Sequence, residues 1–166
     1  MIAALALLLI TPQLPAEPAL LKNGEGVRTK TFLGIQVYRA ALYLERKEKD
    51  PAKILTSSGA WSLELTITHN VGRDRLLAEL RDGISANTAW ATVEAAFLPI
   101  AAALPDARDG QRLRFSYAPD RGTTFAAPGL SPVRVAGPAL GRAILGAYLG
   151  ADPLDPELKR ALLGGP

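Results

Sequence analysis

Alternation of apolar and polar side chains with a period of two is the feature that most constrains the fold of this chain. In residues 35–45 it separates two sets of side chains: Tyr38, Ala40, Leu42 and Leu44 on one side, and Val37, Arg39, Ala41 and Tyr43 on the other. Residues 61–68 and 112–117 alternate in the same way. Such alternation is typical of half-buried β-strands. The sequence therefore predicts at least three strands of this kind.

The remaining elements follow from caps, glycines and helical spacing. Shorter strands are predicted near residues 19–22, 27–33, 123–126 and 133–135. Asp50-Pro51 is typical of a helix start, and Leu76, Leu77, Leu80 and Ile84 share one face of a second helix. A third helix is predicted to begin at Asn87 or Thr88 and to kink or restart at Pro99. Two helices end the chain, and a length of 166 residues fits one domain.

The first residues predict a signal peptide. An apolar run, Ile2 to Ile10, is followed by Leu14-Pro15-Ala16, a plausible cleavage site. The run is shorter than the roughly 20 residues that a membrane span needs, so no stable membrane anchor is expected. We therefore expect a signal over residues 1–16, a domain over residues 17–166, and a periplasmic or secreted protein. A buried first strand or a misplaced start codon are the alternatives.

Composition excludes several classes of chemistry. The chain has no cysteine, which removes disulfides, thiolate nucleophiles and cysteine metal sites. Its single histidine, His69, lies near no acidic cluster and near no nucleophile motif, so neither a metal site nor a hydrolase triad is expected. The net charge of +3 is spread along the chain, which argues against a nucleic-acid partner. No cofactor motif is present.

Arg28 is the candidate functional residue that the local sequence singles out. The stretch Asn23 to Gly26 is predicted to form a turn that delivers Arg28 beside a largely apolar surface. A guanidinium suits a carboxylate or an oxyanion, because it donates two parallel hydrogen bonds and keeps its charge. The alternative is an arginine at a strand end that forms a salt bridge or faces water.

Four segments resemble the chalcone isomerase-like proteins, in particular their short bacterial branch. They are residues 23–45 (NGEGVRTKTFLGIQVYRAALYLE), 66–88 (TITHNVGRDRLLAELRDGISANT), 104–123 (LPDARDGQRLRFSYAPDRGT) and 139–164 (ALGRAILGAYLGADPLDPELKRALLG). They stand in the order of that family and cover nearly everything after residue 20. The resemblance implies an α+β open-faced sandwich, with an antiparallel sheet, helices packed on one face and a ligand cleft between them.

The resemblance also implies site residues. The arginine that stabilises a phenoxide in the plant isomerases matches Arg28. The strand threonine of the isomerases falls on Tyr38, and the threonine of their last helix falls near Ala147. Their helix tyrosine and asparagine fall within residues 86–90, where Asn87 offers a polar head group. These departures weigh against chalcone cyclisation.

Fatty-acid-binding members of the superfamily keep an arginine and a tyrosine that hold a carboxylate. Of the two tyrosines near Arg28, we favour Tyr38 over Tyr43, because it occupies the strand position that faces the cleft in the family. Arg28, Tyr38 and Asn87 are thus the predicted ligand-binding residues, for a small apolar acid. Arg28, expected to face a wet cleft, should then contribute little to stability.

Two alternatives stay open at this point. One is an isomerase, or intramolecular lyase, that acts on a phenolic or conjugated substrate through Arg28 as its catalytic residue. The other is an interaction module whose cleft is filled by its own side chains.

Overall fold

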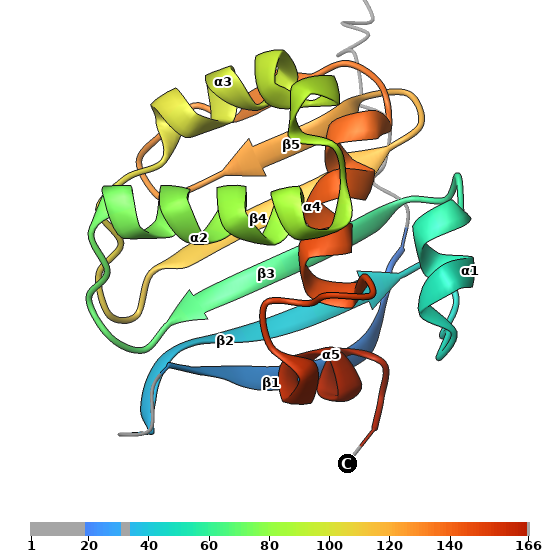
Figure 1. Ribbon diagram of the computed structural model, residues 1–166, viewed down its shortest axis with the longest axis horizontal. Helices are drawn as coiled ribbons and strands as arrows, with labels where there is room; N and C mark the ends of the chain where they lie inside the picture. Colours follow the sequence, from blue (N-terminus) through green and yellow to red (C-terminus); the bar gives the residue numbers. More distant parts are fainter. Residues whose placement is uncertain (1–18, 31–33, 166) are drawn as a thin grey trace, which may run out of the picture.

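The sheet has six antiparallel strands, and each strand pairs with the next along the chain (Figure 1). The computed structural model describes residues 19–30 and 34–165, so the predicted signal over residues 1–16 lies outside the described residues. The strands are β1 (Leu21–Lys30), β2 (Ile35–Leu44), β3 (Trp61–Ile67), β4 (Arg112–Ala118), β5 (Gly122–Ala126) and β6 (Val133–Val135). The alternating segments of the sequence are β2, β3 and β4, as predicted.

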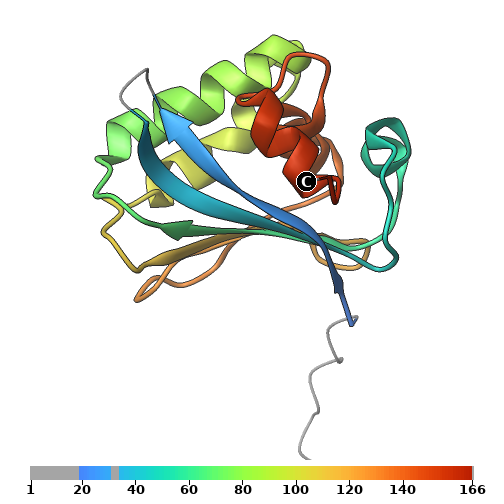
Figure 2. The same cartoon turned by 90° about the horizontal axis from the view of Figure 1, so that it is seen from below.

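Helices cover one face of this sheet. They are α1 (Pro51–Thr56), α2 (Arg73–Asn87), the 3-10 helix η1 (Trp90–Thr92), α3 (Glu94–Ala103), α4 (Ala139–Leu149) and α5 (Pro156–Leu162). Figure 2 shows α2, α3, α4 and α5 on the same side, while the opposite face carries none of the described helices. The α+β open-faced sandwich is therefore confirmed. None of the helices in the described ranges is long and apolar enough to span a membrane.

The core lies between the sheet and these helices. Strand register sets Tyr38 beside Ile67 and Leu42 beside Leu63, and Leu63 in turn lies beside Phe115, so one face of the sheet is continuously apolar. Every residue of α4 from Ala143 to Leu149 is buried against this face. Burial of this apolar surface contributes most of the folding free energy, at about 25 cal/mol per Å².

The predicted turn at Asn23 to Gly26 is wrong. β1 runs through these residues without a break, and the register against β2 shifts between Lys22 and Gly24 and again between Arg28 and Thr29. Instead, the glycines allow α5 to approach β1 closely. A Cβ on Gly24 would lie 2.6 Å from the carbonyl oxygen of Leu162, and one on Gly26 would lie 2.6 Å from the Cβ of Ala161. Glycine therefore lets α5 pack directly on β1.

The predicted helix start at Asn87 or Thr88 is also wrong. Asn87 is the last residue of α2, and the next α-helix begins only at Glu94. Pro99 lies inside that helix, α3, and does not end it. Proline removes the hydrogen bond to the carbonyl four residues earlier. Here that residue, Ala95, is exposed, so water can bind the freed carbonyl.

We expect Gly24→Ala to destabilise the protein, because the added methyl would meet backbone atoms of α5 that cannot move aside. Overpacking of this kind costs about 1–3 kcal/mol. Gly146→Ala is the matched control. Its Cβ would meet only the Cβ of Asn87, at 3.7 Å, and alanine is the better helix former. Urea unfolding should show opposite signs for the two variants; an unchanged midpoint for Gly24→Ala would contradict the close packing of α5 on β1.

Candidate functional site

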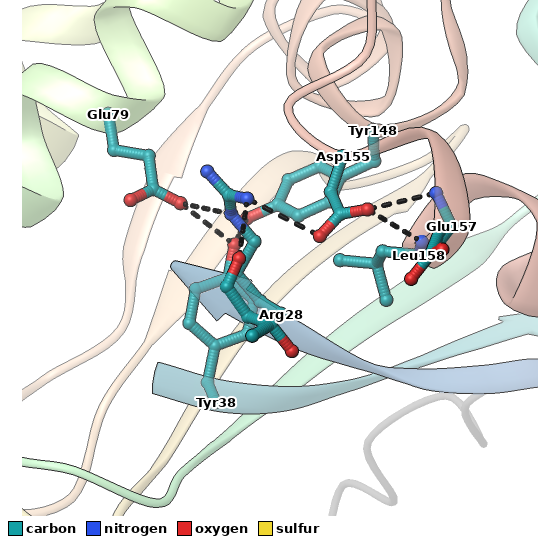
Figure 3. Close-up of polar contacts among 8 residues, drawn as sticks. Arg28, Tyr38, Glu79, Tyr148, Asp155, Glu157 and Leu158 are labelled. Atoms are coloured by element: carbon teal, nitrogen blue, oxygen red, sulfur yellow. Dashed lines mark hydrogen bonds and ion pairs between the residues drawn. The ribbon is translucent and has the colours of Figure 1, made fainter. Parts of the chain in front are cut away.

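The site is organised around Arg28, which projects from β1 toward the helices (Figure 3). Arg28 pairs with Tyr38 across the β1–β2 ladder, so both side chains lie on the helix-covered face. Its Nε donates to Glu79 Oε1 at 3.1 Å, and its Nη1 donates to Asp155 Oδ2 at 3.3 Å. Nη1 also donates to the carbonyl of Thr29 at 3.2 Å. The guanidinium is thus held between two carboxylates.

Helix α2 supplies the first carboxylate. Glu79 stands between Leu76 and Leu80, which are both buried, and its own side chain is only 9% exposed. Besides Arg28, it accepts a hydrogen bond from the hydroxyl of Tyr38 at 3.2 Å. The same oxygen, Oε1, therefore receives both donors.

The second carboxylate also caps a helix. Oδ1 of Asp155 accepts from the backbone N–H groups of Glu157 and Leu158, at 2.9 and 3.1 Å, at the start of α5. Its other oxygen faces Arg28. A capping bond fixes the carboxylate relative to its helix. Asp155 is consequently the less mobile partner of Arg28.

Tyr148 of α4 completes what we call the Arg28 cluster: Arg28, Tyr38, Glu79, Tyr148 and Asp155. The two tyrosine hydroxyls lie 3.5 Å apart, at the outer limit of a hydrogen bond. Burial is the main cause that raises the pKa of Tyr38 well above its ordinary value, and burial likewise raises the pKa of Tyr148. Both phenols are therefore neutral donors over the physiological range.

The charge of the Arg28 cluster is negative overall, since one guanidinium faces two carboxylates. Burial lowers the pKa of Arg28, but Glu79, Tyr38 and Asp155 together outweigh this and raise it. The expectation of a wet cleft is wrong: the side chain of Arg28 is only 14% exposed. Its salt bridges are the structural alternative that the sequence left open. Removing Arg28 would leave two nearly buried carboxylates without their cation, which is costly.

A small apolar cavity of about 10 Å³ adjoins the Arg28 cluster. Tyr38, Glu79 and Tyr148 form its polar side, and its apolar walls are Leu65, Leu76, Leu80, Leu104, Leu113 and Phe115. A cavity of this volume holds at most about one water molecule. In this conformation the space between α2 and the sheet is therefore closed.

The structure brings Arg28 and Tyr38 together, but it gives Asn87 other partners. The amide of Asn87 donates to the carbonyls of Gly83 and Asp152 and accepts from the N–H of Asp152. It thus fastens the end of α2 to the loop after α4. Tyr43 lies on the opposite face of the sheet, under Lys22. No group of acidic or histidine side chains within the described ranges could hold a metal ion.

Three members of the Arg28 cluster escaped the sequence analysis. Glu79 stands where a solvated acid of a helix is common, although its position between Leu76 and Leu80 is a usable signal. Asp155 precedes a proline, which is typical of a helix cap. Tyr148 lies in an apolar helix stripe, which is typical of a core residue.

Comparison with known proteins agrees with this architecture. The sequence model of a family described as chalcone isomerase-like matches residues 12–164. The crystal structure of a fatty-acid binding protein from Arabidopsis thaliana is similar, with a TM-score of 0.67 at 15% sequence identity. The match covers 89% of this chain and 88% of that one. No curated protein sequence matches the chain.

We expect the buried tyrosines to make the fold sensitive to alkali. Because their pKa values are raised above 10.0, the unfolded chain releases protons that the native state keeps as the pH rises past that value. Stability should thus be intact below about pH 10 and fall above it. Urea unfolding at about pH 9 and about pH 11 would measure the loss, and Tyr148→Phe should reduce it. An equal loss in Tyr148→Phe would contradict this.

Proposed function

Because the chain belongs to the chalcone isomerase-like family, we propose that it binds a small apolar carboxylate, such as a fatty acid. The head group binds at Arg28 and the hydroxyl of Tyr38, and the apolar tail lies between α2 and the sheet. The observation that carries the proposal is the position of the Arg28 cluster. Its two phenols and Glu79 line a cavity whose other walls are apolar, and Arg28 is bonded to Glu79 at that edge. The Arabidopsis protein that shares the fold, a fatty-acid binding protein, supports the same ligand class.

Glu79 occupies the position beside Arg28 that the ligand carboxylate would take. A ligand carboxylate added to the Arg28 cluster would meet two carboxylates already there, so binding must displace one of them. Asp155 is held by its capping bonds at the start of α5, whereas Glu79 lies within α2 and moves with that helix. We therefore propose an exchange, in which the ligand replaces Glu79 at Arg28. The exchange trades one ion pair for another, so the net affinity comes mainly from burial of the tail.

The tail needs more room than the closed cavity offers. Leu76 and Leu80 of α2 form one wall, and strands β3 and β4 form the opposite wall. At its other end α2 is tightly packed, since a Cβ on Gly83 would lie 2.9 Å from the Cβ of Ala147. Gly72, the N-cap residue of α2, has no side chain to cap it, and the first N–H of the helix, that of Arg73, instead donates to Asp106 Oδ1 at 2.8 Å. An outward movement of this end would have to break that hydrogen bond. We propose that this first half of α2 moves outward, which displaces Glu79 and opens the cavity in one motion.

Binding is favoured over isomerisation by the same contacts. An isomerase would use Arg28 to stabilise a phenoxide as it develops, which requires donors preorganised toward the substrate. In this chain Nε and Nη1 of Arg28 are directed at carboxylates. Loss of chalcone absorbance in proportion to protein concentration would favour the isomerase instead.

The first test uses a pair of ligands that differ only in the head group, decanoate and decanol. Glu79→Gln should raise the affinity for decanoate, because it removes the competing charge. Arg28→Lys should lower this affinity, because an ammonium group cannot donate the two parallel hydrogen bonds of a guanidinium. Charge-assisted bonds of this kind are equivalent to roughly a tenfold change or more in each direction. Isothermal titration calorimetry would measure both changes in affinity. The affinity for decanol should change little with either substitution.

The matched control is Glu157→Gln, the same substitution at an exposed position near the Arg28 cluster. It should leave decanoate affinity unchanged. If Glu157→Gln and Glu79→Gln had equal effects, or if Arg28→Lys bound decanoate as well as the native protein, carboxylate binding at Arg28 would be wrong. Failure of decanoate and decanol to bind any variant would favour an interaction module with a filled cleft.

We also propose that the protein is exported, with a signal over residues 1–16 and a periplasmic or secreted domain over residues 17–166. The apolar run of Ile2 to Ile10 and the small residue Ala16 support this. Cleavage after Ala16 would leave β1 whole, because this strand begins at Leu21.

The intact mass of the protein recovered from a bacterial periplasm should match a chain that begins near Glu17. Replacing Leu7 and Leu8 by arginine, which breaks the apolar run, should keep the protein in the cytoplasm at full length. A periplasmic protein that still begins at Met1 would contradict cleavage.

A further inference from the structure

A hollow of about 170 Å³ lies on the face of the sheet that no described helix covers. We call it the open-face groove and define it by Ser62, Arg114, Ser116, Thr124 and Arg134, with Arg121 at its rim. Strand register sets Ser62, Ser116, Thr124 and Arg134 side by side across β3 to β6. Three hydroxyl-bearing residues thus form its floor.

This face carries an excess of positive charge. Its described charged residues are five basic and two acidic, as the strand register places them: Lys22, Arg39, Arg112, Arg114 and Arg134 against Glu25 and Glu64. The excess equals the net charge of the whole chain, +3. No acidic side chain among the described residues lines the open-face groove.

The arginines of the open-face groove have guanidinium N–H groups that their ion pairs do not use. Arg114 uses its Nε in the ion pair with Glu64, at 3.3 Å, and Glu64 lies outside the groove. Arg134 is exposed and forms no ion pair within the described part of the chain. The hydroxyls of Ser116 and Thr124 likewise bond to no other described side chain or backbone group. These groups are available to a ligand.

The spacing lets both arginines reach one small anion. Arg114 lies two residues from Ser116 on β4, and Arg134 lies two strands away on β6. Neighbouring strands are about 4.8 Å apart, so the two arginines stand on either side of Thr124, within reach of an anion above it. The hydroxyls of Ser116 and Thr124 can then donate from below.

We propose that the open-face groove binds the phosphate group of a small soluble phosphomonoester. A phosphate dianion has three oxygens that accept charge-assisted hydrogen bonds, enough for two guanidinium groups and the hydroxyls of the floor. A carboxylate has one oxygen fewer and a smaller charge, so it can accept fewer of these hydrogen bonds. A flat anionic bilayer would meet the arginines but not the hydroxyls at the bottom of the hollow. This site is separate from the Arg28 cluster, which lies on the other face of the sheet.

The test is a titration of the protein with phenyl phosphate, followed by amide chemical shifts and by calorimetry. The shifts should move at Ser116, Thr124 and Arg134. Arg134→Gln should weaken binding roughly tenfold or more, because it removes a charge-assisted fork. Arg39→Gln is the matched control: it removes the same charge from the same face, outside the groove. It should change the affinity far less, and Arg28→Lys should not change it at all.

Four results would overturn the proposal. The first is that phenyl phosphate changes no amide chemical shift. The second is that Arg39→Gln and Arg134→Gln lose the same affinity for phenyl phosphate, which would mean diffuse attraction by the whole face. The third is binding to vesicles that contain phosphatidylglycerol without binding of phenyl phosphate, which would assign the face to a membrane surface. Benzoate, a carboxylate with the same ring, should bind more weakly than phenyl phosphate; equal affinity would also count against the phosphate site.

Discussion

A guanidinium held between two carboxylates is the interaction on which the rest of the structure depends. Arg28 lies on an edge strand, Glu79 on α2, and Asp155 at the start of α5, so one side chain connects three elements. All three are nearly buried, and the loss of any one would leave charge without compensation in a poorly hydrated place. The glycines of β1 support this interaction, because they let α5 approach closely enough for its capping residue, Asp155, to reach Arg28.

The contacts that stabilise the Arg28 cluster also oppose a ligand there. With one cation and two carboxylates, the closed state is a satisfied network, and in the proposed exchange a bound acid takes the place of Glu79. Stability and affinity are therefore expected to change in opposite directions when Glu79 is altered, a trade-off that is common at functional sites. The closed cavity imposes a second cost, since α2 must move before a tail can be buried. Affinity then depends on how much apolar surface the tail loses to water.

The sheet separates two kinds of surface by the alternation of its strands. Every second residue of β2 to β5 points to the helices, and these residues form the apolar floor of the core. The residues between them form the opposite, open face, which is rich in arginine and hydroxyl groups. A strand shifted by one residue would exchange the two sets. The same register therefore fixes the apolar core, the Arg28 cluster and the open-face groove, although the two proposed anion sites share no residue.

The sequence by itself determined what depends on near neighbours. The alternation in β2, β3 and β4 predicted both the strands and their buried faces, and the short β1–β2 connection brought Arg28 and Tyr38 together. What only the tertiary structure decided involves partners far apart in the chain. Glu79 is 51 residues from Arg28 and Asp155 is 127 residues from it, so no local pattern identifies either of them as a partner of Arg28. Gly24 and Gly26 likewise read as a turn, because their local preference is for one. Only the approach of α5, more than a hundred residues later, makes the absence of a side chain there a requirement of packing.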